Sequence, residues 1–418
     1  MKKLLRILGP GLLYAGAAIG VSHLVQSTRA GASYGFYLIW ILLFVNIIKY
    51  PFFEFATRYA AATHESLIDG YRRIGKWAII AFALLTVSTM FVIQAAVTIV
   101  TAGLFDSIFG LNMNPVILSA IILGSTMIIL MIGRYSVLDK LIKVVILILA
   151  MSTIIAVTSA FGKGFDPNPE NIHSFDWLKN ADILFLIAFI GWMPAPIDVS
   201  VWSSLWTNAK RISSGYNTTV RDSLLDFKIG YIGTAILAAC FLSLGALVMY
   251  GSGDDLSSNG TIFSGQLISM YTSSIGEWAY YIIAIAALTT MYSTTLTCID
   301  AYPRVLMPTS KILFPNFIAK FSRSYYVYWF WIIIVTVGAI LMLSVFSSSM
   351  QIMVDLATTL SFLTAPVLAF MNYKVVTSKH LQDDLKPSKG MRLYAWIGMV
   401  FLSGFTVFYI VWRIYSVI

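Results

Sequence analysis

Apolar residues run along almost the whole chain in segments of about 20 residues, and short polar connections separate these segments. An α-helix of about 20 apolar residues spans the hydrocarbon core of a bilayer. We predict eleven such helices, near residues 8–29, 36–60, 78–105, 114–133, 139–161, 182–206, 228–250, 277–302, 325–346, 350–374 and 392–415. The pattern therefore indicates an all-α integral membrane protein in which residues 1–418 form one transmembrane domain.

Composition agrees with this reading. Hydrophobic residues make up 58% of the chain and charged residues only 11%, whereas a soluble domain carries about 25% charged residues. The net charge of +9 does not indicate a nucleic-acid partner, because the basic residues lie in short connections and form no continuous basic face. Cys240 and Cys298 fall in apolar segments, which is typical of buried core residues rather than of a disulfide framework.

Basic residues alternate between the connections in a way that predicts orientation, since cytoplasmic loops of membrane proteins are enriched in Lys and Arg. The connections expected in the cytoplasm hold Lys2, Lys3, Arg6, Arg72, Arg73, Lys76, Arg134, Lys210, Arg211, Arg221, Arg304, Lys311, Lys320, Arg323, Lys374, Lys379, Lys386, Lys389 and Arg392. The opposite connections are richer in acids, among them Asp166, Glu170, Asp176, Asp254 and Asp255. We expect the N-terminus in the cytoplasm, the C-terminus outside, and a location in a bacterial inner (plasma) membrane.

Two predicted spans contain signals that interrupt a helix. The first carries Gly16-Ala-Ala-Ile-Gly20-Val-Ser22-His23, and the sixth carries Gly191-Trp-Met193-Pro194-Ala-Pro196-Ile-Asp198, in which the prolines remove backbone donors. Because five helices separate these breaks, the two halves have opposite orientations in the membrane. Paired breaks in inverted halves indicate the binding site of a secondary transporter. We predict inverted repeats of helices 1–5 (about 8–161) and 6–10 (about 182–374), followed by helix 11 (about 392–415).

At these breaks the sequence resembles the Nramp family of proton-coupled divalent metal transporters. The resemblance rests on Gly9-Pro10-Gly-Leu-Leu, on Arg29-Ala30-Gly31 through Trp40, on Met193-Pro194 and on Ser361-Phe-Leu-Thr364-Ala-Pro366. It implies the leucine-transporter-type fold, with 5+5 inverted repeats and broken helices 1 and 6. It also implies divalent metal transport by alternating access.

The residues that perform the family's chemistry are largely replaced in this chain. The metal-binding Asp-Pro-Gly-Asn of helix 1 corresponds to Gly20-Val21-Ser22-His23, and only Met193 remains of the Met-Pro-His-Asn motif in helix 6. Thr98 and Thr101 stand at the positions of the helix 3 acids used for proton movement, and Thr364 at that of the helix 10 glutamine. We therefore expect an altered site without the family's proton coupling.

We expect the cargo to bind between the halves of the broken helices. The candidate binding residues are Gly20, Ser22, His23, Ile190 through its carbonyl, Met193, Asp198 and Thr364. His23 and Met193 are the candidate metal ligands, and imidazole with sulfur suits iron(II), zinc or copper better than magnesium or calcium. Neither a cofactor nor an obligate protein partner is indicated beyond the transported solute or ion and the lipid bilayer.

Lys49 is predicted to lie inside helix 2, where a central lysine costs about 2.5–3.5 kcal/mol on insertion scales. One interpretation makes it a fixed or switchable cation that replaces a coupling ion. The other makes it half of a structural ion pair with Glu54, although Glu54 has better helical spacing to Arg58. We assign Lys49 and Glu54, with Thr98 and Thr101, to a candidate coupling or ion pathway. Asp300 is expected to form a cap or an ion pair.

Two alternatives to metal transport remain at this stage. The loss of the helix 1 aspartate and the exposed N-terminal half-helix ends also suit an amino acid or another small carboxylate. A membrane sensor that keeps the fold without transport is a lesser alternative. No phosphate-binding loop, zinc-protease motif or paired-cysteine metal motif occurs in the chain, so we do not expect an enzyme.

Overall fold

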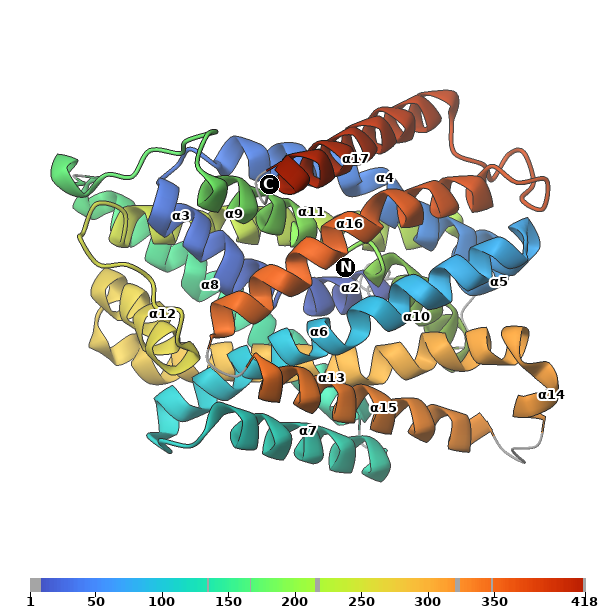
Figure 1. Cartoon of the computed structure of the whole chain (residues 1–418), viewed down its shortest axis with the longest axis horizontal. Coiled ribbons are helices and arrows are strands. Elements are labelled where there is room, and N and C mark those ends of the chain that lie inside the picture. The colour runs from blue at the N-terminus through green and yellow to red at the C-terminus, as the bar shows by residue number, and fades with distance from the viewer. Residues whose placement is uncertain are drawn as a thin grey trace.

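The computed structural model describes residues 9–133, 135–165, 167–214, 219–319, 324–346 and 349–415. Several charged residues used to predict orientation lie outside the described residues, namely Lys2, Lys3, Arg6, Arg134, Asp166, Lys320 and Arg323. Within the described parts the protein is a helical bundle without strands (Figure 1). The all-α prediction is therefore confirmed.

The first half of the chain contains α2 to α8, and its first predicted span is divided into three short helices. These are α2 (Pro10–Ala18), the π-helix η1 (Ser22–Ser27) and α3 (Thr28–Tyr34). The remaining elements are α4 (Ile39–Thr63), α5 (Leu67–Ile74), α6 (Lys76–Phe109), α7 (Pro115–Ile132) and α8 (Tyr135–Lys163), with the 3₁₀ turn η2 (Pro169–Asn171) after them.

The second half begins with another divided span, α9 (Asn180–Trp192) and α10 (Val199–Ser214). It continues with α11 (Val220–Val248), α12 (Gly260–Ile275), the 3₁₀ turn η3 (Glu277–Ala279), α13 (Tyr280–Leu313), α14 (Pro315–Ile318), α15 (Ser324–Val345), α16 (Met350–Val376) and α17 (Lys389–Tyr415). The predicted connection between residues 250 and 277 thus contains a helix, α12, which is too short to cross a bilayer.

Nine helices in the described parts of the chain are long and apolar enough to cross a membrane. The two interrupted spans are not among them, because each is built from shorter pieces. The count of eleven crossing segments therefore stays a prediction, while both predicted interruptions are present.

The broken helices lie inside the bundle and are enclosed by unbroken ones. Helix α11 packs against α2, α3 and α4, and α16 packs against α9 and α6. On another side α13 packs between α6 and α15. Figure 1 shows α2 in the middle of the bundle, with α7 and α15 along one edge and α17 along the other. The breaks are thus screened from the outer surface.

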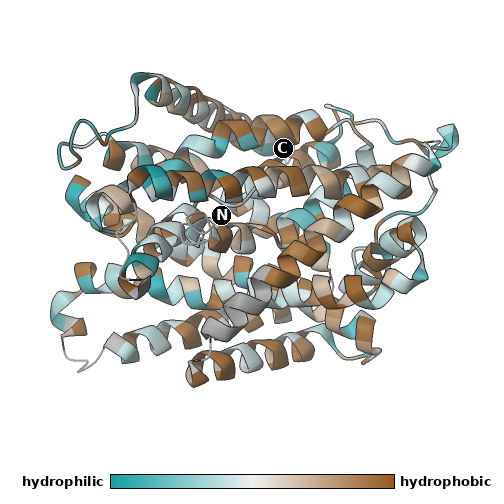
Figure 2. Ribbon diagram, turned by 180° about the vertical axis from the view of Figure 1, so that it is seen from behind, coloured by the Kyte–Doolittle hydropathy of each residue, from teal (hydrophilic) through white to brown (hydrophobic). Residues whose placement is uncertain are grey.

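Polarity is arranged as a lipid environment requires. Large apolar side chains such as Leu84, Ile121 and Val400 face outward, and many hydrophilic residues lie in the connections at the two ends of the bundle (Figure 2). Polar side chains such as Lys49 and Gln94 are fully buried. Buried polar groups within membrane-spanning helices point to binding or transport pathways.

One buried amide joins four helices near the second break. Asn372 on α16 accepts a hydrogen bond from the Tyr71 hydroxyl of α5 at 2.6 Å. Its amide nitrogen donates to the Phe52 carbonyl of α4 at 3.0 Å and to the Ser200 hydroxyl of α10 at 2.9 Å. These hydrogen bonds hold α10, the second part of the broken span, against the unbroken helices.

Candidate functional site

The first break lies between α2 and η1. Helix α2 ends at Ala18, and Ile19 leaves the helical conformation with φ −77° and ψ 88°. Gly20 follows, and a Cβ there would meet the Thr294 side chain of α13 at 2.9 Å. Glycine therefore allows the interrupted backbone to lie directly against α13. This places the predicted site residues Gly20, Ser22 and His23 in the interior.

The second break follows α9, where Met193 is extended and the chain turns through Pro194 and Pro196 before α10 begins. In a continuous helix the Ile190 carbonyl would accept from the nitrogen of residue 194. Because that residue is proline and has no N–H, the Ile190 carbonyl is freed for another donor. The break therefore creates an acceptor site inside the membrane-embedded part of the bundle.

Lys49 fills this acceptor site. Its Nζ lies 2.6 Å from the Ile190 carbonyl oxygen and 2.8 Å from the Gly191 carbonyl oxygen, and the residue is fully buried. Both distances are typical of charge-assisted hydrogen bonds. The structure therefore brings together two predicted site residues, Lys49 and Ile190, by a contact between helix 2 and the break in helix 6.

Gly191 is essential to the position of these carbonyls. A Cβ at this residue would lie 2.0 Å from the Thr358 carbonyl oxygen of α16, so α9 and α16 can approach this closely only with glycine. The neighbouring Trp192 donates from Nε1 to the Ser361 hydroxyl of α16 at 2.7 Å. Helix α16 thus supports the end of α9 that Lys49 contacts.

Asp198 lies just before α10, at the far end of the second break. It is buried, and its carboxylate and the Lys49 ammonium are near enough to interact electrostatically. Its Oδ1 atom has no hydrogen-bond partner among the residues that the structure describes. A buried carboxylate oxygen without a partner is costly, and it is available to a cation.

His23 is fully buried on η1, and both of its ring nitrogens are engaged. Nε2 lies 3.0 Å from the Thr234 carbonyl oxygen, so this nitrogen carries a proton. Nδ1 lies 2.8 Å from the Ser22 hydroxyl, whose single proton can be donated either to this nitrogen or to the Ala18 carbonyl oxygen 2.6 Å away. Metal ligation by His23 stays a prediction, and it requires one of these bonds to break.

Met193, the other candidate metal ligand, is fully buried at the second break. Its sulfur lies 4.0 Å from the Ser27 hydroxyl at the end of η1. This contact places the end of η1 beside the second break, and a site shared by the two breaks stays a prediction. Ser27 was not among the predicted site residues, and only its place one helical turn after His23 could have indicated it.

Thr98 and Thr101, which the sequence analysis assigned to a candidate ion pathway, lie in a polar seam between α6 and α13. Thr101 bonds to the Met291 carbonyl at 3.1 Å and to the Thr295 hydroxyl at 2.8 Å. Thr98 bonds within α6 to Gln94. Thr364 donates only to Ser361 of its own helix, at 3.0 Å, and is half-buried. None of these groups titrates near neutral pH.

Glu54 binds Arg58, not Lys49. The two side chains form an ion pair with 2.5 Å between Glu54 Oε1 and Arg58 Nη2. The proposed structural pair of Lys49 with Glu54 is therefore wrong, because the four-residue spacing to Arg58 brings the charges together on one face of α4. Asp300 forms the expected ion pair, with Arg304, at 2.6 Å.

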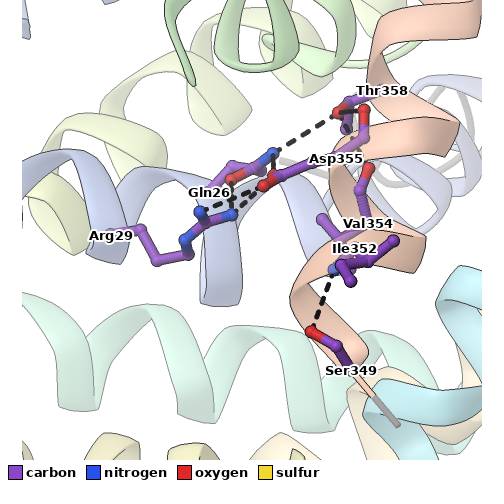
Figure 3. A network of polar contacts seen from close by, with 7 residues as sticks. All are labelled: Gln26, Arg29, Ser349, Ile352, Val354, Asp355 and Thr358. Atoms are coloured by element: carbon purple, nitrogen blue, oxygen red, sulfur yellow. Dashed lines mark hydrogen bonds and ion pairs between the residues drawn. The ribbon is translucent and has the colours of Figure 1, made fainter. Parts of the chain in front are cut away.

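A charged network joins η1 and α3 to α16 (Figure 3). Arg29 donates to Asp355 Oδ1 at 2.7 Å and to Gln26 Oε1 at 2.9 Å, while Gln26 also donates to Asp355 at 3.3 Å. The Arg29 guanidinium lies 5.1 Å from the centre of the Phe185 ring on α9. These contacts join η1, α3 and α9, which flank the two breaks, to one another and to α16.

A carboxylate holds the opposite end of the first broken span. Asp226 on α11 accepts from the Gly9 N–H at 3.1 Å and from the Gly11 N–H at 2.7 Å. These N–H groups belong to the N-terminal turn of α2, where unpaired donors and the helix dipole favour an anion. Neither this contact nor the Arg29–Asp355 pair was predicted, since each joins residues more than 200 positions apart in the sequence.

A small cavity of about 30 Å³ lies between the breaks on the α2 side. Its lining consists of Ala17, Ala18, Val21, Ser22, Ile93, Val97, Trp192, Pro196, Val199, Trp202, Thr294 and Cys298. This volume suits about one water molecule or a small ion. Trp192 and Pro196 of the second break and Ser22 beside the first break face this cavity together.

A helical membrane bundle with two facing breaks, a freed carbonyl pair and contacts closing both ends is the architecture of a secondary transporter. A family model described as natural resistance-associated macrophage protein-like (Nramp) matches residues 11–412. The chain therefore belongs to this family, whose members are transporters rather than enzymes, and the resemblance found in the sequence is confirmed.

Individual proteins agree with this assignment. An uncharacterised protein of Pasteurella multocida (strain Pm70) is 36% identical over 410 residues, which cover 96% of this chain and 91% of that protein. The manganese transporter of Eremococcus coleocola has a similar fold, with a TM-score of 0.70 and 13% identity over 97% of this chain and 86% of that one. MhsT, solved in complex with L-phenylalanine, gives a TM-score of 0.58 and 16% identity over 94% and 97%. These similarities confirm the leucine-transporter-type fold.

Proposed function

We propose that this protein is a secondary transporter that moves a divalent metal ion across a membrane by alternating access. The observation that carries the proposal is the cation-binding character of the second break. The Ile190 and Gly191 carbonyls hold the Lys49 ammonium at hydrogen-bonding distance. Family membership and the likeness to a manganese transporter support a metal ion as the cargo.

The groups around the breaks define which metal would bind. The described residues contain no cluster of three or more His, Cys, Asp or Glu side chains that could hold a metal. We therefore assign cargo binding to the Ile190 carbonyl, the Met193 sulfur, the Asp198 carboxylate and the Ser27 hydroxyl, with water completing the shell. The oxygen ligands suit manganese(II), and the thioether favours a softer transition metal such as iron(II) over calcium and magnesium.

We infer that transport proceeds without the proton pathway of the family. The supporting observation is the seam between α6 and α13, where Thr98 and Thr101 bond to neighbouring carbonyls and hydroxyls. Hydroxyls of this kind do not exchange protons near neutral pH. We further propose that the N-terminus is cytoplasmic and the C-terminus lies outside, in a bacterial inner membrane, as the distribution of basic connections indicates.

A small carboxylate or amino acid is the second candidate cargo. The specific observation in its favour is the buried ammonium of Lys49 beside the break, a positive group that could pair with a carboxylate. The cavity of about 30 Å³ opposes it, because an amino acid requires a larger space. Cargo screening in liposomes separates the two candidates.

The test is uptake of manganese(II) into proteoliposomes that contain the purified full-length protein and an internal metal-sensitive dye. We expect saturable uptake, reduced in Met193→Ala, because that change removes the sulfur ligand. Met131→Ala is the matched control, since Met131 is exposed on α7 away from the breaks. Absence of uptake by folded protein, together with uptake of a labelled amino acid, would refute the metal proposal.

A further inference from the structure

We propose that Lys49 is a tethered occupant of the cargo site, and that its ammonium and the cargo cation bind the Ile190 and Gly191 carbonyls in alternation. This inference deepens the proposed function and rests on it for the identity of the cargo. The occupancy itself rests only on contacts between residues of this chain.

The first step of the argument is the nature of the Lys49 contacts. A lysine ammonium has three donors, and two of them are directed at carbonyl oxygens 2.6 and 2.8 Å away. The acceptors are the carbonyls at the end of α9, one of which Pro194 deprives of its helical donor. Lys49 therefore satisfies backbone groups that a bound cation would otherwise satisfy.

The second step is the absence of room for two cations. Ile190 and Gly191 are buried, and the fully buried Lys49 ammonium already lies at hydrogen-bonding distance from both carbonyl oxygens. Two positive charges at hydrogen-bonding distance from the same oxygens repel each other strongly in a site of low dielectric constant. A metal ion can therefore use these carbonyls only after the ammonium has left them.

The third step is a place for the displaced ammonium. Asp198 is buried, interacts electrostatically with Lys49, and has an oxygen without a hydrogen-bond partner among the described residues. Glu54, which lies on α4 with Lys49, is already paired with Arg58. A buried carboxylate with an unpartnered oxygen at the same break is the group toward which a displaced ammonium would turn.

The consequence is that Lys49 occupies the cation site of the transporter when no cargo is bound. An unliganded site would leave two buried carbonyls without donors and a buried carboxylate without a cation, which is unfavourable in a membrane. With Lys49 present, the transporter can close around the breaks when no cargo is bound. The lysine then lowers cargo affinity by the fraction of time for which it occupies the carbonyls.

One experiment tests occupancy without any cargo. The Lys49→Ala protein is purified at full length, and its thermal unfolding is followed with increasing methylammonium or tetramethylammonium. Methylammonium is a detached lysine head group, whereas tetramethylammonium has the charge but no N–H donor. We expect a saturable stabilisation of Lys49→Ala by methylammonium only. Wild type and Lys228→Ala, which loses an exposed lysine of α11, should not respond.

A second experiment tests the alternation with the cargo. Manganese(II) is titrated calorimetrically into wild type, Lys49→Met and Lys228→Met. Methionine keeps the length of the side chain and removes its charge, so we expect Lys49→Met to bind manganese(II) about tenfold more tightly or better. Unchanged or weaker binding by folded Lys49→Met would overturn the alternation.

The two experiments separate this inference from the proposed function. Stabilisation of Lys49→Ala by methylammonium, with no manganese(II) binding by wild type or either methionine variant, would support occupancy by Lys49. It would also remove manganese as the cargo. A Lys49→Ala protein that methylammonium neither stabilises nor helps to fold would overturn the inference, even if manganese(II) were transported.

Discussion

Arg29 at the start of α3 and Asp355 on α16 form an ion pair with 2.7 Å between Nη1 and Oδ1. Gln26 bridges the same two side chains, and the Arg29 side chain is largely buried. The pair therefore joins the second part of the first broken span to an unbroken helix. It is a charged contact that ties the α3 side of the site to α16.

Neutralising this pair should loosen the α3 side. In Asp355→Asn the Arg29 guanidinium loses its carboxylate partner and keeps a single neutral amide oxygen as acceptor, so the ion pair and one of its two hydrogen bonds are lost. We expect amide hydrogen exchange in residues 22–34 to accelerate by about 5–30-fold, as a loss of 1–2 kcal/mol implies. Asp383→Asn is the control, because it removes only an exposed pair with Lys386. Equal exchange in both variants would show that the pair does not restrain these residues.

Weakening the contact between Asp226 and the N-terminal turn of α2 should loosen the α2 side of the site. Asp226→Asn retains one acceptor for two N–H groups of α2 and loses the charge that favours this helix end. Since Ala17 and Ala18 of α2 line the cavity with Cys298, we expect faster labelling of Cys298 by a small thiol reagent in a Cys240→Ala background. Asp222→Asn on the same helix is the matched control. Unaltered labelling would show that Asp226 does not restrain α2.

Asn372 should contribute measurably to the free energy of unfolding. Asn372→Ala removes one acceptor and two donor contacts that join α4, α5, α10 and α16. Hydrogen bonds between membrane helices contribute about 0.6–1.7 kcal/mol each, so we expect a loss of about 1–3 kcal/mol. Denaturant unfolding in detergent measures it, with the exposed Gln382→Ala as control. A loss within experimental error would mean that water replaces the amide.

Glu54 and Arg58 should behave as a structural pair and not as part of an ion pathway. Glu54→Gln leaves the Arg58 charge uncompensated beside a buried position, and breaking a buried pair costs about 3–5 kcal/mol. The double change Glu54→Gln, Arg58→Gln should cost less than the two single changes added together. A double-mutant cycle of unfolding free energies checks this. A double variant that recovers stability but does not transport would instead assign Glu54 to the ion pathway.

Transport should not respond to an imposed proton gradient. Thr98 and Thr101 are bonded hydroxyls at the seam between α6 and α13, and they cannot pick up or release a proton between about pH 5 and 8. Manganese(II) uptake into liposomes at equal internal and external pH should therefore match uptake with the outside acidified by one unit. Stimulation by the gradient would point to another titrating group.

Much of the fold could be predicted from local sequence. The apolar segments gave the bundle, Gly20 indicated the first break, and Pro194 and Pro196 indicated the second, because glycine and proline act on the backbone where they stand. The freed Ile190 carbonyl also follows from Pro194 by counting four residues back. These features depend on neighbours in the chain and need no knowledge of tertiary packing.

The partners of the charged groups could not be predicted in the same way. Lys49 was compared with Glu54, its nearest acid in sequence, whereas its bonded partners are carbonyls about 140 residues away. Asp226 and Asp355 likewise reach the first broken span from α11 and α16. Residue types do not show which side chain reaches a free backbone carbonyl, because helix packing decides this.

The contact at Gly191 has a mechanical consequence. Because the backbones of α9 and α16 approach closely there, and Trp192 is bonded to Ser361, we expect the two helices to move together. Asp355 lies three residues before Thr358 on the same helix, so a force that separates Asp355 from Arg29 is transmitted directly to the carbonyls that hold Lys49. The Arg29–Asp355 pair and the carbonyls that hold Lys49 are thus attached to the same pair of packed helices, and a methyl group at residue 191 would force these helices apart.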